Sequence, residues 1–129
     1  MRGPRRRGRA RGERALGERA LAGFAALCLL VLAAACEKET HRAARKAFQD
    51  ILAGDLSSAG RASALEAFVR DYPEPKTNPH LTRACSMLAS HHARSGRADI
   101  AASWYERAIR ADPDDPDLLN ALGYHYARN

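Results

Sequence analysis

A pattern of apolar and small residues occurs twice in this chain, 34 residues apart (position 85 to position 119). The first copy is Cys85, Leu88, Ala89 and His92, and the second is Leu119, Leu122, Gly123 and Tyr126. Steps of three and four residues place side chains on one face of a helix. A fixed period of this length indicates stacked units that bury their apolar faces against one another. The repeat therefore predicts an array of short helices.

The residues between the two copies complete the pattern of a known family. They are Ala101, Tyr105, Ala108 and Pro113. This spacing resembles the tetratricopeptide repeat (TPR), a helix–turn–helix unit that stacks into a superhelix. The resemblance implies an all-α fold, namely a TPR-like α-solenoid of antiparallel helix pairs with about five helices after an N-terminal signal segment.

A looser copy of the pattern precedes these two. Phe48-x2-Ile51-Leu52 and Ala64-x3-Phe68 match the good repeat with a shift of 37 residues, and the extra residues fit a proline-containing loop at 72–79. The phrase FVRDYP that begins at Phe68 also resembles the end of a second helix in TPR-like lipoproteins of envelope assembly. The TPR-like helical domain is thus expected at 41–129, with a degenerate repeat at 45–81, a good repeat at 82–115 and a half repeat at 116–129.

The resemblance also implies packing roles for the residues of the pattern. Ala89 and Ala101 are small where the two helices of a repeat approach most closely. Tyr105 and Ala108 are expected to meet the residues of the next copy, and a proline ends the second helix. The expected repeat-packing residues are Cys85, Leu88, Ala89, His92, Ala101, Tyr105, Ala108, Pro113, Leu119, Leu122, Gly123 and Tyr126.

Capping residues and helix breakers predict where each helix begins and ends. We expect helices at 41–53, 59–71, 79–95, 97–111 and from 116 onwards. Ser, Thr, Asn and Asp favour the N-cap, proline suits the first helical position, and glycine favours the end of a helix. Candidate residues at the starts are Thr40, Asn78, Pro79, Asp115 and Pro116, and candidates at the ends are Gly54 and Gly96.

The first 35 residues have the organisation of a secretory signal peptide. Residues 1–19 hold eight arginines, residues 20–35 are an uncharged apolar run, and three alanines close that run. A basic n-region, an apolar h-region and small residues at the exit are typical of such a signal. The run of 16 residues is shorter than the roughly 20 that a membrane-spanning helix needs. A retained signal anchor is the alternative interpretation.

Cys36 follows the small residues directly. The phrase LAAAC, ending at Cys36, resembles the bacterial lipobox, although alanine stands where leucine is usual, three residues before the cysteine. The resemblance implies a thioether-linked diacylglyceryl group on Cys36, cleavage before it and N-acylation, followed by a lipidated tether at 36–40. It also implies a lipid-anchored protein of the bacterial cell envelope. An ordinary signal peptide, leaving a soluble periplasmic protein, is the alternative.

The net positive charge of the chain comes entirely from this leader. Residues 1–19 carry eight arginines and two glutamates, which is the whole formal charge of +6. The remainder has 21 − 8 = 13 basic and 15 − 2 = 13 acidic residues, so it is neutral. A nucleic-acid-binding domain keeps a basic face, so no nucleic-acid partner is expected. Cys85 would be the one thiol left after processing, and its place on the inward stripe predicts a small buried residue.

The remaining predictions concern binding and chemistry. Carried over from the family, the concave groove would be lined by the first helix of each repeat, and an extended acidic or polar peptide would suit it. No catalytic arrangement, metal site or cofactor is expected: the adjacent His91 and His92 point about 100° apart, and the aspartates at 112–117 suit helix capping. The groove candidates are Arg83, Ser86, Ser90, Arg94, Asp117, Asn120, Tyr124 and Arg128, with Lys46 and Gln49 in the degenerate repeat.

The last predicted helix has no following helix to cover its apolar face. Three interpretations stay open: a truncated piece of a longer array, a face filled by a partner or by a second copy, or a poorly adapted cap. The expected function is a non-catalytic protein–protein interaction scaffold, with envelope or pilus assembly among the settings that the resemblance implies. A soluble periplasmic accessory subunit is the alternative.

Overall fold

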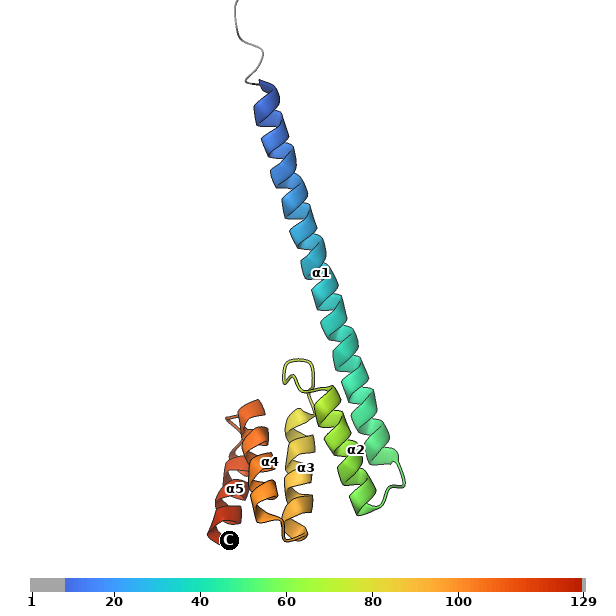
Figure 1. The fold of residues 1–129 in the computed structure, drawn as a ribbon, viewed down its shortest axis with the longest axis vertical. Helices are drawn as coiled ribbons and strands as arrows, with labels where there is room; N and C mark the ends of the chain where they lie inside the picture. Colours follow the sequence, from blue (N-terminus) through green and yellow to red (C-terminus); the bar gives the residue numbers. More distant parts are fainter. Residues whose placement is uncertain (1–8, 129) are drawn as a thin grey trace, which may run out of the picture. The chain divides into compact units, whose positions relative to one another are not determined.

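The computed structural model describes residues 9–128, with side chains described from Leu27 onwards. Residues 1–8, which belong to the predicted n-region, and residue 129 lie outside the described residues. Within the described range the chain forms five α-helices and no strand (Figure 1). The expected all-α fold of about five helices is therefore confirmed. The helices are α1 (Arg9–Ala53), α2 (Ser58–Asp71), α3 (Leu81–Arg94), α4 (Ala98–Ala111) and α5 (Pro116–Arg128).

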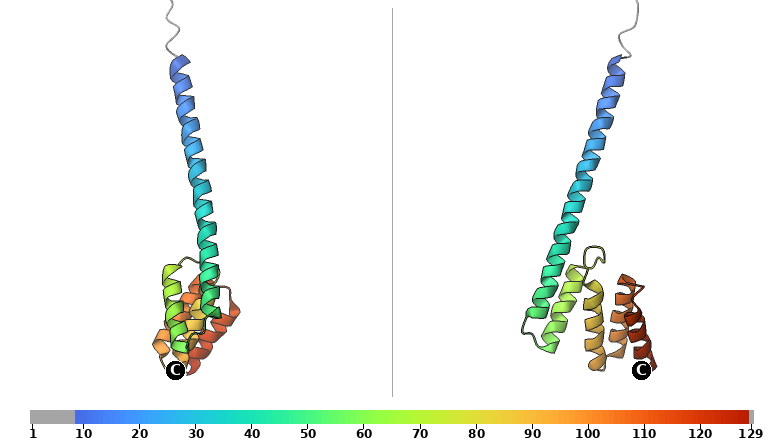
Figure 2. Two further views of the ribbon diagram at one scale, coloured as in Figure 1. Left: turned by 90° about the vertical axis from the view of Figure 1, so that its right-hand side faces the viewer. Right: turned by 180° about the vertical axis from the view of Figure 1, so that it is seen from behind.

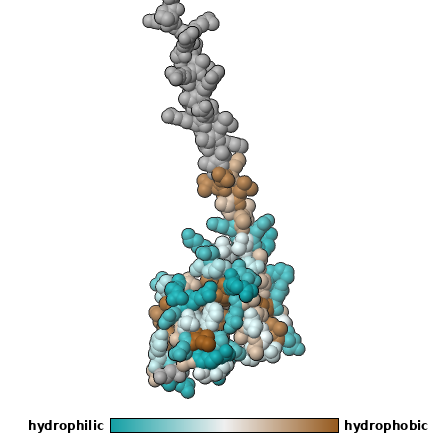
Figure 3. All heavy atoms as spheres, viewed as in Figure 1, coloured by the Kyte–Doolittle hydropathy of each residue, from teal (hydrophilic) through white to brown (hydrophobic). Residues whose placement is uncertain are grey.

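The chain divides into two compact units, Met1–Glu37 and Lys38–Asn129. In the first unit, the described side chains from 27 onwards are all exposed. Five large apolar ones are 58–68% exposed and form a brown band in Figure 3, namely Leu27, Leu29, Leu30, Val31 and Leu32. The second unit holds the whole buried core, from Ala44 to Leu118.

The residues predicted as a tether, 36–40, are helical in the structure, because α1 runs through them without a break. Residues 37–40 contain neither glycine nor proline, and glutamate and lysine are good helix formers. Alanines also lie before Cys36 and after Arg42, so nothing in the local sequence ends the helix. Thr40 consequently lies inside α1 and is not its N-cap.

The other helix limits follow the capping residues closely. The Ser57 hydroxyl accepts a hydrogen bond from the Gly60 amide at 3.1 Å and caps α2. Gly96 adopts φ +72° after α3, where the Arg97 amide donates to the His92 carbonyl at 2.9 Å; this is the left-handed closure that favours glycine. Asp115 Oδ1 accepts from the Asp117 amide at 2.9 Å and caps α5. The predictions for Gly96 and Asp115 are confirmed, and the Ser57 cap is an addition from the structure.

The start of α3 differs from the prediction that Asn78 caps a helix opening at Pro79. The helix begins at Leu81, and Asn78 instead organises the loop before it. Its Nδ2 donates to the Tyr72 carbonyl at 2.7 Å, and its Oδ1 accepts from the His80 amide at 3.0 Å. The side chain is 2% exposed. Asn78 thus joins the end of α2 to the start of α3 in place of a simple helix cap.

The second unit is built from helices packed in chain order. α2 packs against α3, α3 against α4, and α4 against α5, as the two views in Figure 2 also show. The last turns of α1 join this stack through Phe48, whose ring lies 5.5 Å from that of Phe68 and stacks on His80 at 4.6 Å. Burial, followed by nearby positive charge, lowers the pKa of His80, which favours the neutral ring.

The predicted core of the good repeat is confirmed. Cys85, Leu88 and Ala89 are fully buried on α3, and Ala101 and Ala108 are fully buried on α4. Small residues allow α3 and α4 to approach closely. His92 is 4% exposed, with Nε2 at 3.5 Å from a Glu66 carboxylate oxygen. It is therefore a buried histidine of the core, as its position in the repeat predicts.

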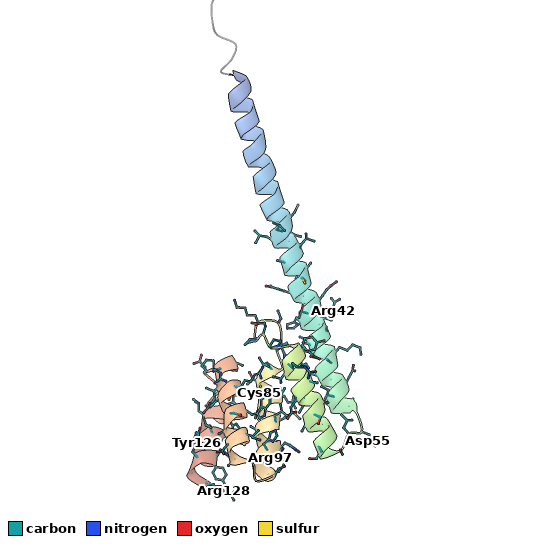
Figure 4. All side chains as sticks on the ribbon, viewed as in Figure 1. Arg42, Asp55, Cys85, Arg97, Tyr126 and Arg128 are labelled. Carbon is teal, nitrogen blue, oxygen red and sulfur yellow. The ribbon has the colours of Figure 1, made fainter. Side chains whose placement is uncertain are left out.

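Burial should make the Cys85 thiol (Figure 4) unreactive in the folded protein. Desolvation raises its pKa from 9.0 to about 11, and Arg107 and Arg110 oppose this shift only in part. The thiolate is the reactive species, so at pH 8 we expect a chain with Cys28→Ala and Cys36→Ala to react with a thiol reagent only after unfolding. Because the folded pKa is the higher one, this thiol's contribution to stability is present below pH 9 and is lost as the pH rises towards 11. Rapid labelling of the native chain at pH 8 would contradict the buried position.

The packing predicted for α5 is wrong in its register. Leu119 and Tyr126 are 50% and 57% exposed, whereas Leu118 and His125 are 4% and 7% exposed. The His125 ring lies 5.8 Å from that of Tyr105, and its Nε2 lies 2.9 Å from the Ala98 carbonyl oxygen. The physical reason lies in the repeat. The apolar and small residues of the repeated pattern lie on the face of the first helix that packs against the second helix of the same repeat. In α3 that helix is α4, and no described helix covers the same face of α5.

Replacing Gly123 by alanine tests this open face. A Cβ atom built at Gly123 meets nothing within 4 Å. Glycine inside a helix costs up to about 1 kcal/mol relative to alanine, so we expect Gly123→Ala to raise the free energy of unfolding by about 0.5–1 kcal/mol in urea denaturation. Gly96→Ala is the opposite control, since φ +72° should make it destabilising by about 1 kcal/mol. A loss of stability in Gly123→Ala would mean that the face is covered in solution.

Candidate peptide-binding groove

Three hollows adjoin α3 in the second unit. The first, here called the α2–α3 hollow, has a volume of about 350 Å³. The α2 helix contributes Ser58 and Arg61 to its wall, and α3 contributes Ser86, Ser90 and Arg94. His91 completes its polar lining, with Nδ1 3.3 Å from the Ser58 hydroxyl oxygen. No carboxylate lines this hollow.

The second, the α3–α5 hollow, has a volume of about 500 Å³. Ser90 and Arg94 line it from α3, and Tyr124 and Arg128 line it from the last turns of α5. Arg128 (Figure 4) is held in place, because its Nη1 donates to the Tyr124 hydroxyl at 2.9 Å and its guanidinium lies 5.4 Å from the Tyr124 ring centroid. This hollow also lacks carboxylates.

The third, the acidic hollow, has a volume of about 320 Å³ and lies at the other end of the same helices. Asp112, Asp115 and Asp117 line it from the α4–α5 turn and the start of α5. Arg83 and Ser86 line it from α3, and the guanidinium of Arg83 lies 5.9 Å from the Phe48 ring centroid. Since the starts of α3 and α5 meet here and their ends meet at the α3–α5 hollow, the two helices run in the same direction.

The structure brings together most of the residues predicted for the groove. Asn120 is exposed but lines none of the three hollows. Lys46 and Gln49 are exposed on α1, where Lys46 pairs with Asp50 at 2.7 Å. The predicted residues that do line a hollow are Arg83, Ser86, Ser90, Arg94, Asp117, Tyr124 and Arg128.

Sequence reasoning missed the contribution of α2. Only first helices of repeats were expected in the groove, yet Ser58 and Arg61 form one wall of the α2–α3 hollow. The available signal was position, because Arg61 directly precedes Ala62, the first buried residue of the α2 stripe. A long side chain at the edge of an apolar stripe lies along the neighbouring helix more often than it points straight into water.

Within residues 9–128, no group of three histidine, cysteine or acidic side chains is placed to hold a metal ion. His91 contacts Ser58, and His125 contacts Tyr105. Of the helices in the described part of the chain, none is both long enough and apolar enough to cross a membrane.

Stacked antiparallel helix pairs with a hollowed surface along their first helices define the class of α-solenoid repeat proteins. Residues 82–125, which cover α3, α4 and most of α5, match the family model described as tetratricopeptide repeat. This segment is therefore similar to a tetratricopeptide repeat, a unit that repeat proteins use to build extended binding surfaces for other proteins. Searches of curated proteins and of solved structures found no match.

Proposed function

We propose that this chain is a non-catalytic interaction scaffold, anchored by lipid on Cys36 to a membrane of the bacterial cell envelope. The tetratricopeptide repeat supports the interaction role, and the groove along α3 supplies a surface for an extended peptide of a protein partner. Envelope or pilus assembly is the setting that the sequence around Phe68–Pro73 favours.

The observation that carries the anchoring proposal is the exposed apolar band from Leu27 to Leu32. Its five large side chains are 58–68% exposed. A contiguous apolar surface of this kind marks a site of contact with a membrane or another apolar partner. Three alanines and then Cys36, itself exposed, follow the band directly. This order supports an apolar signal region that ends at a lipidated cysteine.

The division of the chain also supports this proposal. Cleavage before Cys36 would separate the band from the compact unit that begins at Lys38. The first fully buried side chain of that unit, Ala44, lies eight positions after Cys36, so the cut would remove no core residue. A diacylglyceryl group with an N-acyl chain would then hold the domain, because stable anchoring needs more than one acyl chain.

Palmitate labelling tests the anchor. In a bacterial host with lipoprotein processing, we expect labelled palmitate on the wild-type chain and none on Cys36→Ala. The matched control is Cys28→Ala, which removes the other exposed cysteine of the leader and should keep the label. An unlabelled wild-type chain would contradict the lipid anchor, and label that depends on Cys28 would assign it to the wrong residue.

A soluble periplasmic accessory subunit is the second candidate, and the open face of α5 favours it. Leu119 and Tyr126 are half exposed, and space remains above Gly123. A subunit that completes its fold in a complex would cover this face. Fractionation separates the two candidates: the lipoprotein stays with membranes in a Cys36-dependent manner, whereas the accessory subunit appears in the soluble periplasmic fraction with its partner.

A further inference from the structure

We propose that the groove along α3 selects a peptide whose acidic residues are clustered at one end, where they lie over Arg61, Arg94 and Arg128. This inference rests on the proposed interaction function and specifies the chemistry of the partner. It is carried by the sorting of charge along the groove, by the lack of acidic partners for the arginines within the described residues, and by the continuity of the three hollows.

Charge is sorted along the groove although the chain after residue 19 has no net charge. The residues after position 19 carry 13 basic and 13 acidic side chains. Yet the α2–α3 and α3–α5 hollows together contain three arginines, two histidines and no carboxylate, while the acidic hollow contains three aspartates and one arginine. Clefts lined by one sign of charge focus the field and attract the opposite charge. The end of the groove near Arg94 is therefore a site for carboxylates.

The arginines at this end have no acidic partner within the described residues. Arg61, Arg94 and Arg128 make no ion pair there, unlike Lys46 and Arg70, which pair with neighbouring aspartates. The Nε atom of Arg61 is buried and lacks a hydrogen-bond acceptor in this part of the chain. An unsatisfied buried donor costs free energy, and a carboxylate can accept two parallel hydrogen bonds from one guanidinium. Because this atom is itself enclosed, an acidic ligand side chain would offset the cost by pairing with the rest of the Arg61 guanidinium, which lines the hollow.

The hollows form one continuous path. Ser90 and Arg94 line both basic hollows, and Ser86 lines both the α2–α3 hollow and the acidic hollow. The path thus follows α3 from Arg83 to Arg94. The helix has 14 residues, about 21 Å at 1.5 Å per residue. An extended peptide covers that length with about six residues.

The two ends of this path should distinguish between peptides that have the same charged residues in a different order. Acidic residues over the basic end are attracted, whereas acidic residues near Asp112, Asp115 and Asp117 are repelled. Like charges placed together across an interface suppress wrong partners and fix register. A peptide with clustered acids should therefore bind more tightly than one of equal composition with acids spread along its length.

Synthetic peptides test this proposal on the full chain purified in detergent. We would use three fluorescein-labelled peptides of about ten residues, long enough to exceed the path. One has its acids at one end and lysines at the other, one alternates them, and one replaces acids by amides and lysines by glutamines. By fluorescence anisotropy we expect the clustered peptide to bind about tenfold more tightly than the other two. Arg94→Glu should remove this advantage, about 1.4 kcal/mol.

The matched control is Arg97→Glu, which reverses an exposed arginine three positions away that lines none of the hollows. It should leave the preference for the clustered peptide intact, and the far-UV circular dichroism of both variants should match that of the parent. Equal effects of Arg94→Glu and Arg97→Glu would overturn the proposal, because the attraction would then be general.

The remaining outcomes separate this inference from the interaction function. Equally tight binding of all three peptides would overturn the charge selection and leave peptide binding standing. Binding to none of them would overturn the inference. The proposal of a lipid-anchored scaffold would still be tested separately by palmitate labelling and fractionation. If vesicles of anionic phospholipid bind the Cys36→Ala chain in an Arg94-dependent manner and no peptide binds, the groove recognises lipid and the proposal is wrong.

Discussion

Replacing Phe48 by alanine should be among the most damaging single substitutions in this chain. The Phe48 side chain is 1% exposed and contacts the rings of Phe68 and His80. Loss of a buried phenylalanine costs about 3–5 kcal/mol, out of a total stability of about 5–15 kcal/mol for a natural domain. We expect a large drop in the midpoint of urea denaturation, followed by circular dichroism.

Leu52→Ala is the matched control for this prediction. Leu52 lies one helical turn further along α1 and is 37% exposed. Its removal should cost about 1 kcal/mol or less, since only part of its apolar surface is buried. Equal effects of the two substitutions would mean that the end of α1 does not belong to the folded stack. The comparison thus tests whether the degenerate first repeat is a structural part of the domain.

The second large effect is expected from Asn78→Ala. This substitution leaves the Tyr72 carbonyl and the His80 amide without the hydrogen bonds that Asn78 makes at 2.7 Å and 3.0 Å. Partly buried groups that lose their partners cost about 1–3 kcal/mol each, so we expect a loss of about 2–3 kcal/mol in the free energy of unfolding. The measurement is again urea denaturation.

Two further variants make the Asn78 prediction specific. Asn78→Asp keeps an acceptor for the His80 amide but removes the donor to the Tyr72 carbonyl, so it should also destabilise the chain. Thr77→Ala removes only an exposed hydrogen bond of 3.4 Å to the Glu74 carbonyl and should cost less than about 0.5 kcal/mol. A small loss in the free energy of unfolding of Asn78→Ala would show that the loop between α2 and α3 does not depend on this side chain.

The good repeat could be predicted from sequence because its pattern and its packing are complete within one unit. Cys85, Leu88 and Ala89 mark the face that α4 covers, and the structure buries all three. The same pattern in α5 gave a wrong prediction of burial. Leu119 and Tyr126 lie on the face that a second helix of their own repeat would cover, and the described residues contain no such helix. Leu118 and His125 are the buried residues of α5, and His125 packs against the preceding helix α4. Neither residue belongs to the repeated pattern.

Two other differences come from local rules that a pattern does not capture. The continuity of α1 depends on the absence of a breaker between Ala35 and Thr40, which outweighs a single candidate cap. The groove candidates on α3 and α5 were found by matching repeats, whereas Arg61 was missed because only the first helix of each repeat was expected to line the groove. Which side of α2 meets α3 depends on the angle between the helices, and residue spacing does not determine that angle.

The order of packing has a consequence for how the domain opens. Because α2, α3, α4 and α5 contact mainly their neighbours in the chain, stability is close to a sum of neighbouring interfaces. The α3 helix packs against α2 on one side and α4 on the other, whereas α5 packs mainly against α4. Partial unfolding should therefore begin at the C-terminal helix. Amide hydrogen exchange should be fastest in α5 and slowest where α3 meets α4, and any ligand that joins α3 to α5 should slow exchange in α5 first.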